Sequence, residues 1–344
     1  MLRRGARLGR GLAALTLALL CSGCTAVPSP TPSGAPAEGE RLVIYTSHKE
    51  QVYGPIIKEF QERTGIWVQV VTGGTNDLLE LLTAQADAPV CDVMFGGGVE
   101  SLEAVSDVFE PYLSADTSLW QENARPSTAL WTPFSTLPIV LIYNTKLVPK
   151  GTITGWADLL DERWKGNIAF ADPGISGSSY TALITLLDLL PGEEDDLMLR
   201  FASNLDGRLL SDSGDVAEGV SAGSFHIGVT LEETALKWAA QRSSLALVYP
   251  REGTSAIPDG GALVRGAAHR ESATLFLDFI QGHDVQELVV RDLSRRSVRS
   301  DVAEPAGLPS EAELGVIDYD VVGMAQHKAQ LLLRWDELYQ EVAP

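Results

Sequence analysis

The chain has 344 residues, of which 45% are hydrophobic and 21% charged, so it is long enough to fold as two lobes with separate cores. Its formal net charge is −20, and no cluster of Lys and Arg beyond residue 24 is denser than the four arginines between residues 291 and 299. This balance argues against nucleic acid as a partner, because nucleic-acid binders need a basic face.

The first 24 residues have the pattern of an export signal. Four arginines precede an apolar run from Leu12 to Leu20, which ends in Cys21-Ser22-Gly23-Cys24. The run is too short for a membrane anchor, which needs about 20 apolar residues. The Ser-Gly-Cys ending resembles the lipobox of bacterial lipoproteins, although Cys21 stands where that motif usually has Leu. The resemblance implies a signal peptide over residues 1–23 and a lipid anchor on Cys24.

Residues 24–40 are rich in Pro, Ser and Gly, a composition that predicts a flexible tether. Removing the four arginines of the signal from the 26 basic residues leaves 22 against 46 acidic ones, a net charge of about −24. Such acidity is typical of a solvated surface and says little about a ligand. Cys91 is the one thiol left after the signal, and we expect it to be a small buried hydrophobic residue.

The folded part begins with a strand at residues 42–48 that runs into a polar turn. A helix with Val52, Ile56, Ile57 and Phe60 at helical spacing follows and ends near residue 65, although Pro55 would kink an interior turn. In an open α/β sheet such turns lie at the carboxyl ends of strands, where ligands bind. The residues of this turn are therefore candidate ligand contacts. They are Thr46, Ser47 and His48, of which Thr46 or Ser47 could instead only cap the helix.

Two further strand-turn-helix units are predicted. A strand at 66–72 leads through Gly73-Gly74-Thr75 to a helix with four leucines, at 78, 79, 81 and 82, on its core side. A strand at 92–95 leads through three glycines, 96–98, to a helix start near Val99. Glycines let a backbone approach a ligand closely, but the turn itself also needs them. The alternation predicts a doubly wound, mostly parallel sheet.

The pattern is lost over residues 107–135 and resumes with a strong strand at 138–144, where we expect a change of lobe. A short helix at 156–160 and a strand at 167–170 precede a turn at 172–179, and the following apolar residues form a helix over 180–190. The Ser176-Gly177-Ser178-Ser179 run at that helix start suits an oxyanion such as phosphate, phosphonate or carboxylate. Plain capping is the alternative.

The remaining elements repeat the theme. Residues 208–210 lead through a polar turn with Asp212 and Ser213 to a helix at Val216, and residues 226–229 lead through Thr230 to a helix reaching Trp238. A strand at 245–249 precedes turns at 253–260. The chain then returns to the first lobe from residue 262, with helices at 270–281 and 284–293 and outer helical segments over 311–342.

Six short motifs in a fixed order resemble the extracellular solute-binding proteins of bacterial ABC importers. The resemblance covers about residues 42–302 and is strongest with the group that binds ferric iron, hexose phosphates, phosphoglycerate and aminoethylphosphonate. The motifs are Ile44-Tyr45-Thr46-Ser47-His48-Lys49-Glu50, Asp92-Val93-Met94-Phe95-Gly96-Gly97-Gly98, Asp172-Pro173-Gly174-Ile175-Ser176-Gly177-Ser178, Gly228-Val229-Thr230-Leu231-Glu232-Glu233, Tyr249-Pro250-Arg251-Glu252-Gly253-Thr254-Ser255 and Arg295-Arg296-Ser297-Val298-Arg299.

This resemblance implies a type II periplasmic-binding fold, with two α/β lobes joined by two crossovers and a ligand in the cleft between them. The first lobe would be residues 41–137 plus 256–344, and the second 138–255. It also implies an exported, monomeric protein without a cofactor, which delivers a small solute to a membrane permease.

A tyrosine pair that is typical of the family's iron binders helps to narrow the expected ligand class. Those members have an adjacent tyrosine pair in the second lobe, whereas no two of the eight tyrosines here are adjacent. His48 is at the place of an iron-binding histidine, but it could equally be a turn residue. The other histidines lack zinc-type spacing. We therefore expect a small phosphorylated or phosphonate anion, with ferric iron as the alternative.

The resemblance also assigns roles within the site. The head group would be surrounded by Ser47, Gly97, Gly98, Ser176, Gly177 and Ser178, and the other end held by Asp212, Ser213 and Glu232. Asp212 and Glu232 could instead be helix-start carboxylates without a ligand role. An extracellular hydrolase is a remote alternative, because Ser176 lies in an imperfect G-x-S-x-G context and no paired nucleophile and base is found.

Overall fold

The computed structural model describes residues 38–114, 117–126 and 128–343. The predicted signal peptide at 1–23, Cys24 with its predicted lipid and most of the predicted tether lie outside the described residues. The tether's last residues, Glu38–Glu40, form a short 3-10 helix. Within the described ranges, no helix combines the length and the apolarity that a membrane crossing requires.

A mixed sheet forms the centre of the fold, in the order β2-β1-β3-β8-β4-β6-β5, and β7 and β9 also pair with β4. β1 pairs in parallel with β2 and β3, as β5 does with β6, but every pairing of β4 and β8 is antiparallel. The sheet is thus less parallel than the sequence suggested. The strands are β1 (Leu42–Thr46), β2 (Val68–Thr72), β3 (Val93–Gly98), β4 (Thr132–Asn144), β5 (Ile168–Ala169), β6 (Ile227–Leu231), β7 (Leu245–Val248), β8 (Ala256–Leu263) and β9 (Arg296–Ser297).

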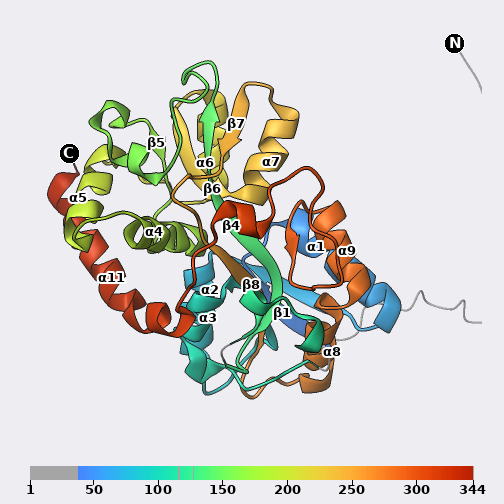
Figure 1. Ribbon diagram of the computed structural model, residues 1–344. Helices are drawn as coiled ribbons and strands as arrows, with labels where there is room; N and C mark the ends of the chain where they lie inside the picture. The colour runs from blue at the N-terminus through green and yellow to red at the C-terminus, as the bar shows by residue number, and fades with distance from the viewer. Residues whose placement is uncertain (1–37, 115–116, 127, 344) are drawn as a thin grey trace, which may run out of the picture. The chain divides into compact units, whose positions relative to one another are not determined.

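β4 and β8 connect the two parts of the sheet. The first half of β4 pairs with β8, and its second half pairs with β6 and β7, so β4 runs through both lobes (Figure 1). The sequence predicted that this strand starts at 138, which is wrong, and that residues 253–260 form turns, which is wrong from Ala256 onward, where β8 begins. Pro133 in β4 and Pro258 with Gly260 in β8 are residues that normally interrupt strands, which explains the errors.

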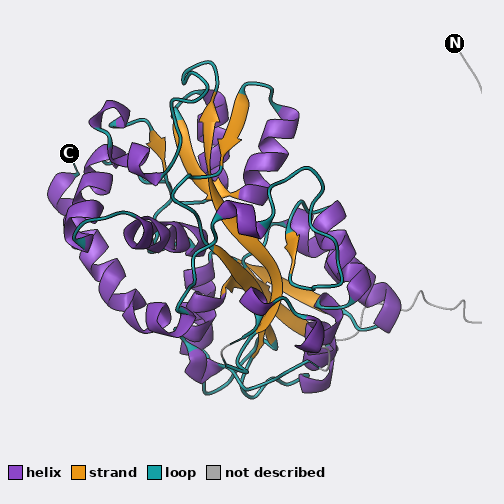
Figure 2. Cartoon of the chain, in the orientation of Figure 1, coloured by secondary structure: helices purple, strands orange, loops and turns teal. Residues whose placement is uncertain are grey.

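Helices cover both faces of the sheet (Figure 2). The predicted helices are found, but α5 was not predicted, and Leu81, expected in the core, is 38% exposed. Pro55 lies inside α1, which ends at Gly65 with φ 73°. The helices are α1 (Glu50–Thr64), α2 (Thr75–Ala84), α3 (Val99–Glu103), α4 (Gly177–Leu189), α5 (Glu194–Leu205), α6 (Gly214–Ala222), α7 (Glu232–Gln241), α8 (Arg270–Ile280), α9 (His283–Arg291), α10 (Glu311–Leu314) and α11 (Val321–Val342).

Side chains alternate along the strands into separate cores. In β1, Leu42 and Ile44 pack toward α1, α8 and α9, whereas Val43 and Tyr45 pack toward α2 and α3. β4 repeats this in the second lobe, with Ile139 facing α4 and α5 and Val140 facing α6 and α7. The expectation of two doubly wound α/β lobes is therefore confirmed. Buried Cys91 lies in the core between α2 and the sheet, as expected.

The last helix does not belong to one lobe alone. α11 begins beside the first lobe, where Val321 packs on the core that contains Val43. Its end contributes Trp335 and Leu338 to the core of the second lobe. The lobe boundaries expected from the sequence stay a prediction, and by its packing the end of α11 groups with residues 138–255.

Candidate ligand-binding cleft

A cavity of about 1130 Å³ is lined by residues of both lobes, and we call it the cleft. The starts of α1, α2, α4, α6 and α7 all open onto it, together with the glycines at the end of β3. Polar turns that the sequence placed after separate strands thus converge on one space. Because a helix start has free amide N–H groups and the positive end of the helix dipole, this arrangement favours an anionic guest.

Most of the predicted contact residues line the cleft, and two do not. Thr46 is fully buried and its hydroxyl accepts a hydrogen bond from the His48 amide at 3.1 Å. Glu232 is bound by the Arg296 guanidinium at 2.8 and 2.9 Å, so its carboxylate is already neutralised away from the cleft. Those that do line it are Ser47, His48, Gly97, Gly98, Ser176, Gly177, Ser178, Asp212, Ser213 and Thr230.

The start of α4 differs from the other helix starts at the cleft. The Ser176 hydroxyl caps the helix by accepting from the Ser179 amide at 3.3 Å, and it lies 3.2 Å from the Ser178 hydroxyl. The first turn of α4 has no acidic residue, whereas the first turns of α1, α2, α3, α6 and α7 each have one or two. The Ser176 side chain is therefore a helix cap, whereas Ser178 lines the cleft at a helix start whose own first turn has no carboxylate.

The start of α3 is occupied by the helix's own carboxylate. Glu100 is fully buried behind Gly98, and a Cβ on that glycine would overlap the Glu100 carboxylate. The Thr181 hydroxyl donates to Glu100 Oε1 at 2.8 Å, and burial raises the pKa of Glu100. Gly97 and Gly98 line the cleft, but an anion there would lie close to this carboxyl group.

The opposite end of the cleft holds charged side chains that pair with one another. Arg295 Nη1 donates to Asp259 Oδ2 at 2.7 Å, and Arg295 Nε binds Glu233 Oε2. Lys237 Nζ donates to Glu233 Oε1 at 2.8 Å. Burial alone would raise the pKa of Glu233, but Arg295 and Lys237 hold it below its ordinary value. These ion pairs join the lobes, since Asp259 lies in β8 and Arg295 directly precedes β9, whereas Glu233 lies on α7 of the second lobe.

The surroundings of His48 favour the neutral form of its imidazole ring. Its ring packs at 4.6 Å from the Phe95 ring and 5.6 Å from the Phe134 ring, and Nε2 lies 3.4 Å from Asp259 Oδ2. Burial, with a smaller effect of nearby Arg295, lowers the pKa of His48 well below 6.5. At neutral pH, His48 therefore contributes no positive charge to the cleft.

An ion pair spans the mouth of the cleft. Lys49, before α1, lies 2.9 Å from Asp212, in the turn before α6. Their side chains are 58% and 49% exposed. The Gly214 amide also donates to Asp212 at 2.6 Å, so this carboxylate has partners without any ligand.

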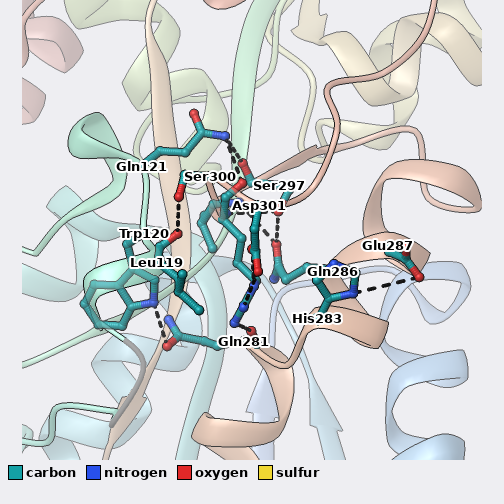
Figure 3. A network of polar contacts seen from close by, with 12 residues as sticks. Leu119, Trp120, Gln121, Gln281, His283, Gln286, Glu287, Ser297, Ser300 and Asp301 are labelled. Carbon is teal, nitrogen blue, oxygen red and sulfur yellow. Dashed lines mark hydrogen bonds and ion pairs between the residues drawn. The ribbon is translucent and has the colours of Figure 1, made fainter.

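The segment that carries Arg295 is fixed by a buried polar network (Figure 3). Gln286 Oε1 accepts from the Ser297 hydroxyl at 2.7 Å and from the Val298 amide at 3.1 Å. Gln281 accepts from Trp120 Nε1 at 3.0 Å, while its backbone carbonyl accepts from Arg299. Sequence reasoning quoted residues 295–299 as a motif but missed Arg295 as a cleft residue. Its place in the Arg295–Arg299 motif, shortly after the predicted helix at 284–293, was the available signal.

Metal ligands are sparse at the cleft. Over the described ranges, no three His, Cys, Asp or Glu side chains are grouped so that they could hold a metal ion. Tyr53 is the one tyrosine among the described residues that line the cleft. Phenolate and carboxylate oxygens are what a hard trivalent cation would need.

Comparison with known proteins identifies the family. A family model described as bacterial extracellular solute-binding protein matches residues 42–292. The chain belongs to this family. An uncharacterized protein of Haemophilus influenzae is 26% identical to this solute-binding protein over 339 residues, which cover 93% of this chain and 95% of that one. The Fe(3+)-binding periplasmic protein of Serratia marcescens is 25% identical over 265 residues, covering 74% and 78%.

The fold of this solute-binding protein also matches solved structures. The periplasmic binding protein AfuA of Actinobacillus pleuropneumoniae, with exogenous fructose-6-phosphate bound, superposes with a TM-score of 0.80 at 22% identity, covering 87% of this chain and 98% of that one. The predicted type II periplasmic-binding fold is therefore confirmed. At this identity the match speaks for the fold alone.

Proposed function

We propose that this protein is the solute-binding component of a bacterial ABC importer. It captures a small organic anion with a phosphate or phosphonate group in the cleft and delivers it to a membrane permease. The relatives support the transport role, because they include periplasmic binding proteins for ferric iron and a structure with a sugar phosphate.

The observation that carries the choice of ligand is the start of α4. A phosphate group needs several donors and a positive field, and α4 provides free amides and the Ser178 hydroxyl without a carboxylate in its first turn. Its neighbour across the cleft is the start of α2, where Gly74 and Thr75 also line the cavity. We place the phosphate at this end, which we call the amide end.

The other end would hold the rest of the solute. Thr230, Ser213 and Lys237 line it, together with Trp238. Hydroxyl groups of a sugar could exchange hydrogen bonds with these side chains, and the tryptophan ring offers an apolar wall. We replace Glu232 in this role by its neighbour Glu233, which does line the cleft.

A ligand panel tests this function. We expect micromolar fructose 6-phosphate, 3-phosphoglycerate or 2-aminoethylphosphonate to raise the melting temperature, since a ligand that binds only the folded state stabilises it by mass action. Fructose and glycerate serve as matched controls without the phosphate. Ferric citrate tests the alternative ligand. A coloured complex with ferric iron, together with no shift in melting temperature from any phosphorylated compound, would favour ferric iron over an organic phosphate as the ligand.

We also propose that the mature protein begins at a lipid-modified Cys24 and is held at the outer face of the cell membrane. The support is the sequence of residues 1–24 alone. Cys24→Ser should release the protein from the membrane fraction and abolish labelling by a palmitate analogue. Unchanged fractionation of that variant would remove the anchor from the account.

A further inference from the structure

The last helix crosses the junction of the two lobes. α11 contacts α3 of the first lobe and α5 of the second, and Figure 1 shows it running from one to the other along the side of the molecule. Val321 at its start packs on a first-lobe core, whereas Trp335 and Leu338 near its end pack in a second-lobe core. α11 is therefore attached at both ends by apolar contacts, and its middle lies over the junction.

A buried lysine projects from this middle stretch. Lys328 is 7% exposed, and its Nζ donates to Asn76 Oδ1 at 2.7 Å and to the Ser101 hydroxyl at 2.8 Å. The same ammonium group lies 4.9 Å from the centre of the Tyr180 ring. Asn76 is on α2, Ser101 on α3 and Tyr180 on α4, so one cation contacts helices of both lobes.

Asn76 connects Lys328 to the second lobe by a hydrogen bond of its own. Its Nδ2 donates to the Gly174 carbonyl at 2.7 Å, and the Pro173 carbonyl lies at 3.4 Å. Because Lys328 donates to the amide oxygen, the NH₂ group must face the turn that precedes α4. The starts of α2 and α4 are thereby held together, and a Cβ on Gly177 would lie 3.1 Å from Thr75 Oγ1.

The surroundings of Lys328 are otherwise poorly solvated. Glu100 lies nearby on α3 without a direct bond to Lys328, and its Oε1 accepts from Thr181 on α4 at 2.8 Å. Burial lowers the pKa of Lys328 to about 8, and the Glu100 charge opposes this effect. Keeping a desolvated ammonium group in this position costs free energy, which its hydrogen bonds must offset.

We infer that Lys328 is a positioning residue for the cleft, which acts through Asn76 to hold the starts of α2 and α4 next to each other, with α11 as a strap across both lobes. The amide end of the cleft is built from these two helix starts. Loss of the lysine contact would let them separate, so the arrangement in which the two helix starts adjoin would be less populated. The choice of a phosphorylated probe below rests on the proposed function, but the inference itself does not.

The distance between the lobes gives a test that needs no ligand. Spin labels at Lys58→Cys on α1 and Arg200→Cys on α5 would report it, because both native side chains are exposed and Cys91 is buried. In this background, Lys328→Met should shift the distance distribution of the ligand-free protein toward longer values. Arg334→Met is the matched control, since it removes a cation from the same helix whose partners are Asp195 on α5 and Glu337 on α11 itself, and it should leave the distribution unchanged.

A second variant separates positioning from a general loss of stability. Asn76→Asp keeps an acceptor for Lys328 but removes the donors to the turn before α4, so it should lengthen the distance as Lys328→Met does, even if the latter fails to fold. Fructose 6-phosphate serves as the probe. It should dissociate from both variants about tenfold faster than from wild type, at an unchanged association rate, which corresponds to a loss of about 1.4 kcal/mol in binding free energy. Wild-type distances in Asn76→Asp and in any folded Lys328→Met protein would overturn the inference, whereas failure of the probe to bind wild type would count only against the proposed function.

Discussion

The two ends of the cleft differ in how their polar groups are paired. At the charged end, Arg295, Glu233, Asp259 and Lys237 satisfy one another and join the lobes. At the amide end, α4 presents amides and the Ser178 hydroxyl with no acidic residue in its first turn. The ion-paired groups at the charged end hold the structure together, whereas the helix-start amides of α4 and the Ser178 hydroxyl, which bonds only to the neighbouring Ser176 hydroxyl at 3.2 Å among the described contacts, can turn to a solute. The ligand's charge is therefore expected at the end where the first turn of α4 has no acidic residue.

The largest effect is expected from a variant that removes Arg295, the central cation of the charged end. Arg295→Met leaves the buried Asp259 and Glu233 carboxylates without their main partner, and we expect a loss of about 3–5 kcal/mol in the free energy of unfolding. Urea denaturation measures it. The control is Arg291→Met, which breaks an exposed pair with Asp292 on the same stretch of chain and should leave the midpoint unchanged. Equal midpoints for both variants would mean that the charged end does not hold the lobes.

The next effect concerns binding at the amide end. Ser178→Asp adds a carboxylate at the start of α4, and repulsion of the phosphate should weaken affinity about 100-fold or more. Ser178→Ala is the matched control and should cost less than about tenfold, because it removes one neutral hydrogen bond. Calorimetric titration with fructose 6-phosphate compares the two. If Ser178→Asp binds like wild type, the phosphate does not lie at this helix start.

The two ends should also respond to pH in opposite directions. The pKa of Glu233 is lowered in the folded state, so its stabilising effect is present above pH 4.5 and is lost as pH falls through the folded pKa. The pKa of Glu100 is raised, so the stability linked to its protonated form is present below pH 4.5 and is lost as pH rises through the folded pKa.

Unfolding of Glu233→Gln and Glu100→Gln at several pH values measures this difference. The stability advantage of wild type over Glu233→Gln should shrink as pH falls below 4.5, and that over Glu100→Gln should shrink as pH rises above 4.5. Each pH unit between the folded and unfolded pKa amounts to about 1.4 kcal/mol. Parallel pH profiles for the two variants would show that both carboxyl groups have the same kind of environment.

The smallest effect is expected at the mouth. Lys49→Met breaks an ion pair whose members are about half exposed, and such pairs contribute less than about 1 kcal/mol. We expect solute to dissociate at most about fivefold faster at low salt, with no difference at about 0.5 M salt, where exposed charges are screened. Stopped-flow release experiments would show it. A large effect that persists at high salt would make Asp212 and Lys49 part of the solute contacts themselves.

Much of this molecule could be predicted from local sequence. The helical spacing of Val52, Ile56 and Phe60 and the glycine at 65 gave the first helix correctly, and the polar turns at Ser47 and Ser176 were placed at the cleft. What could not be predicted depends on long-range pairing. Glu232 and Glu233 are adjacent in sequence. Only the fold shows that Glu232 binds Arg296 whereas Glu233 lines the cleft. β8 was missed because Pro258 and Gly260 normally interrupt strands, and what makes this segment a strand is its pairing with β3 and β4, which are distant in sequence.

The most direct test of the account compares one solute with and without its phosphate. Calorimetric titration of the purified protein with fructose 6-phosphate and with fructose, in buffer freed of iron and inorganic phosphate, measures what the phosphate contributes. We predict that the phosphate ester binds at least about 100-fold more tightly, which corresponds to about 2.7 kcal/mol or more from the helix-start donors. Equal affinities for the two compounds, or binding of neither beside tight binding of ferric iron, would contradict the central claim.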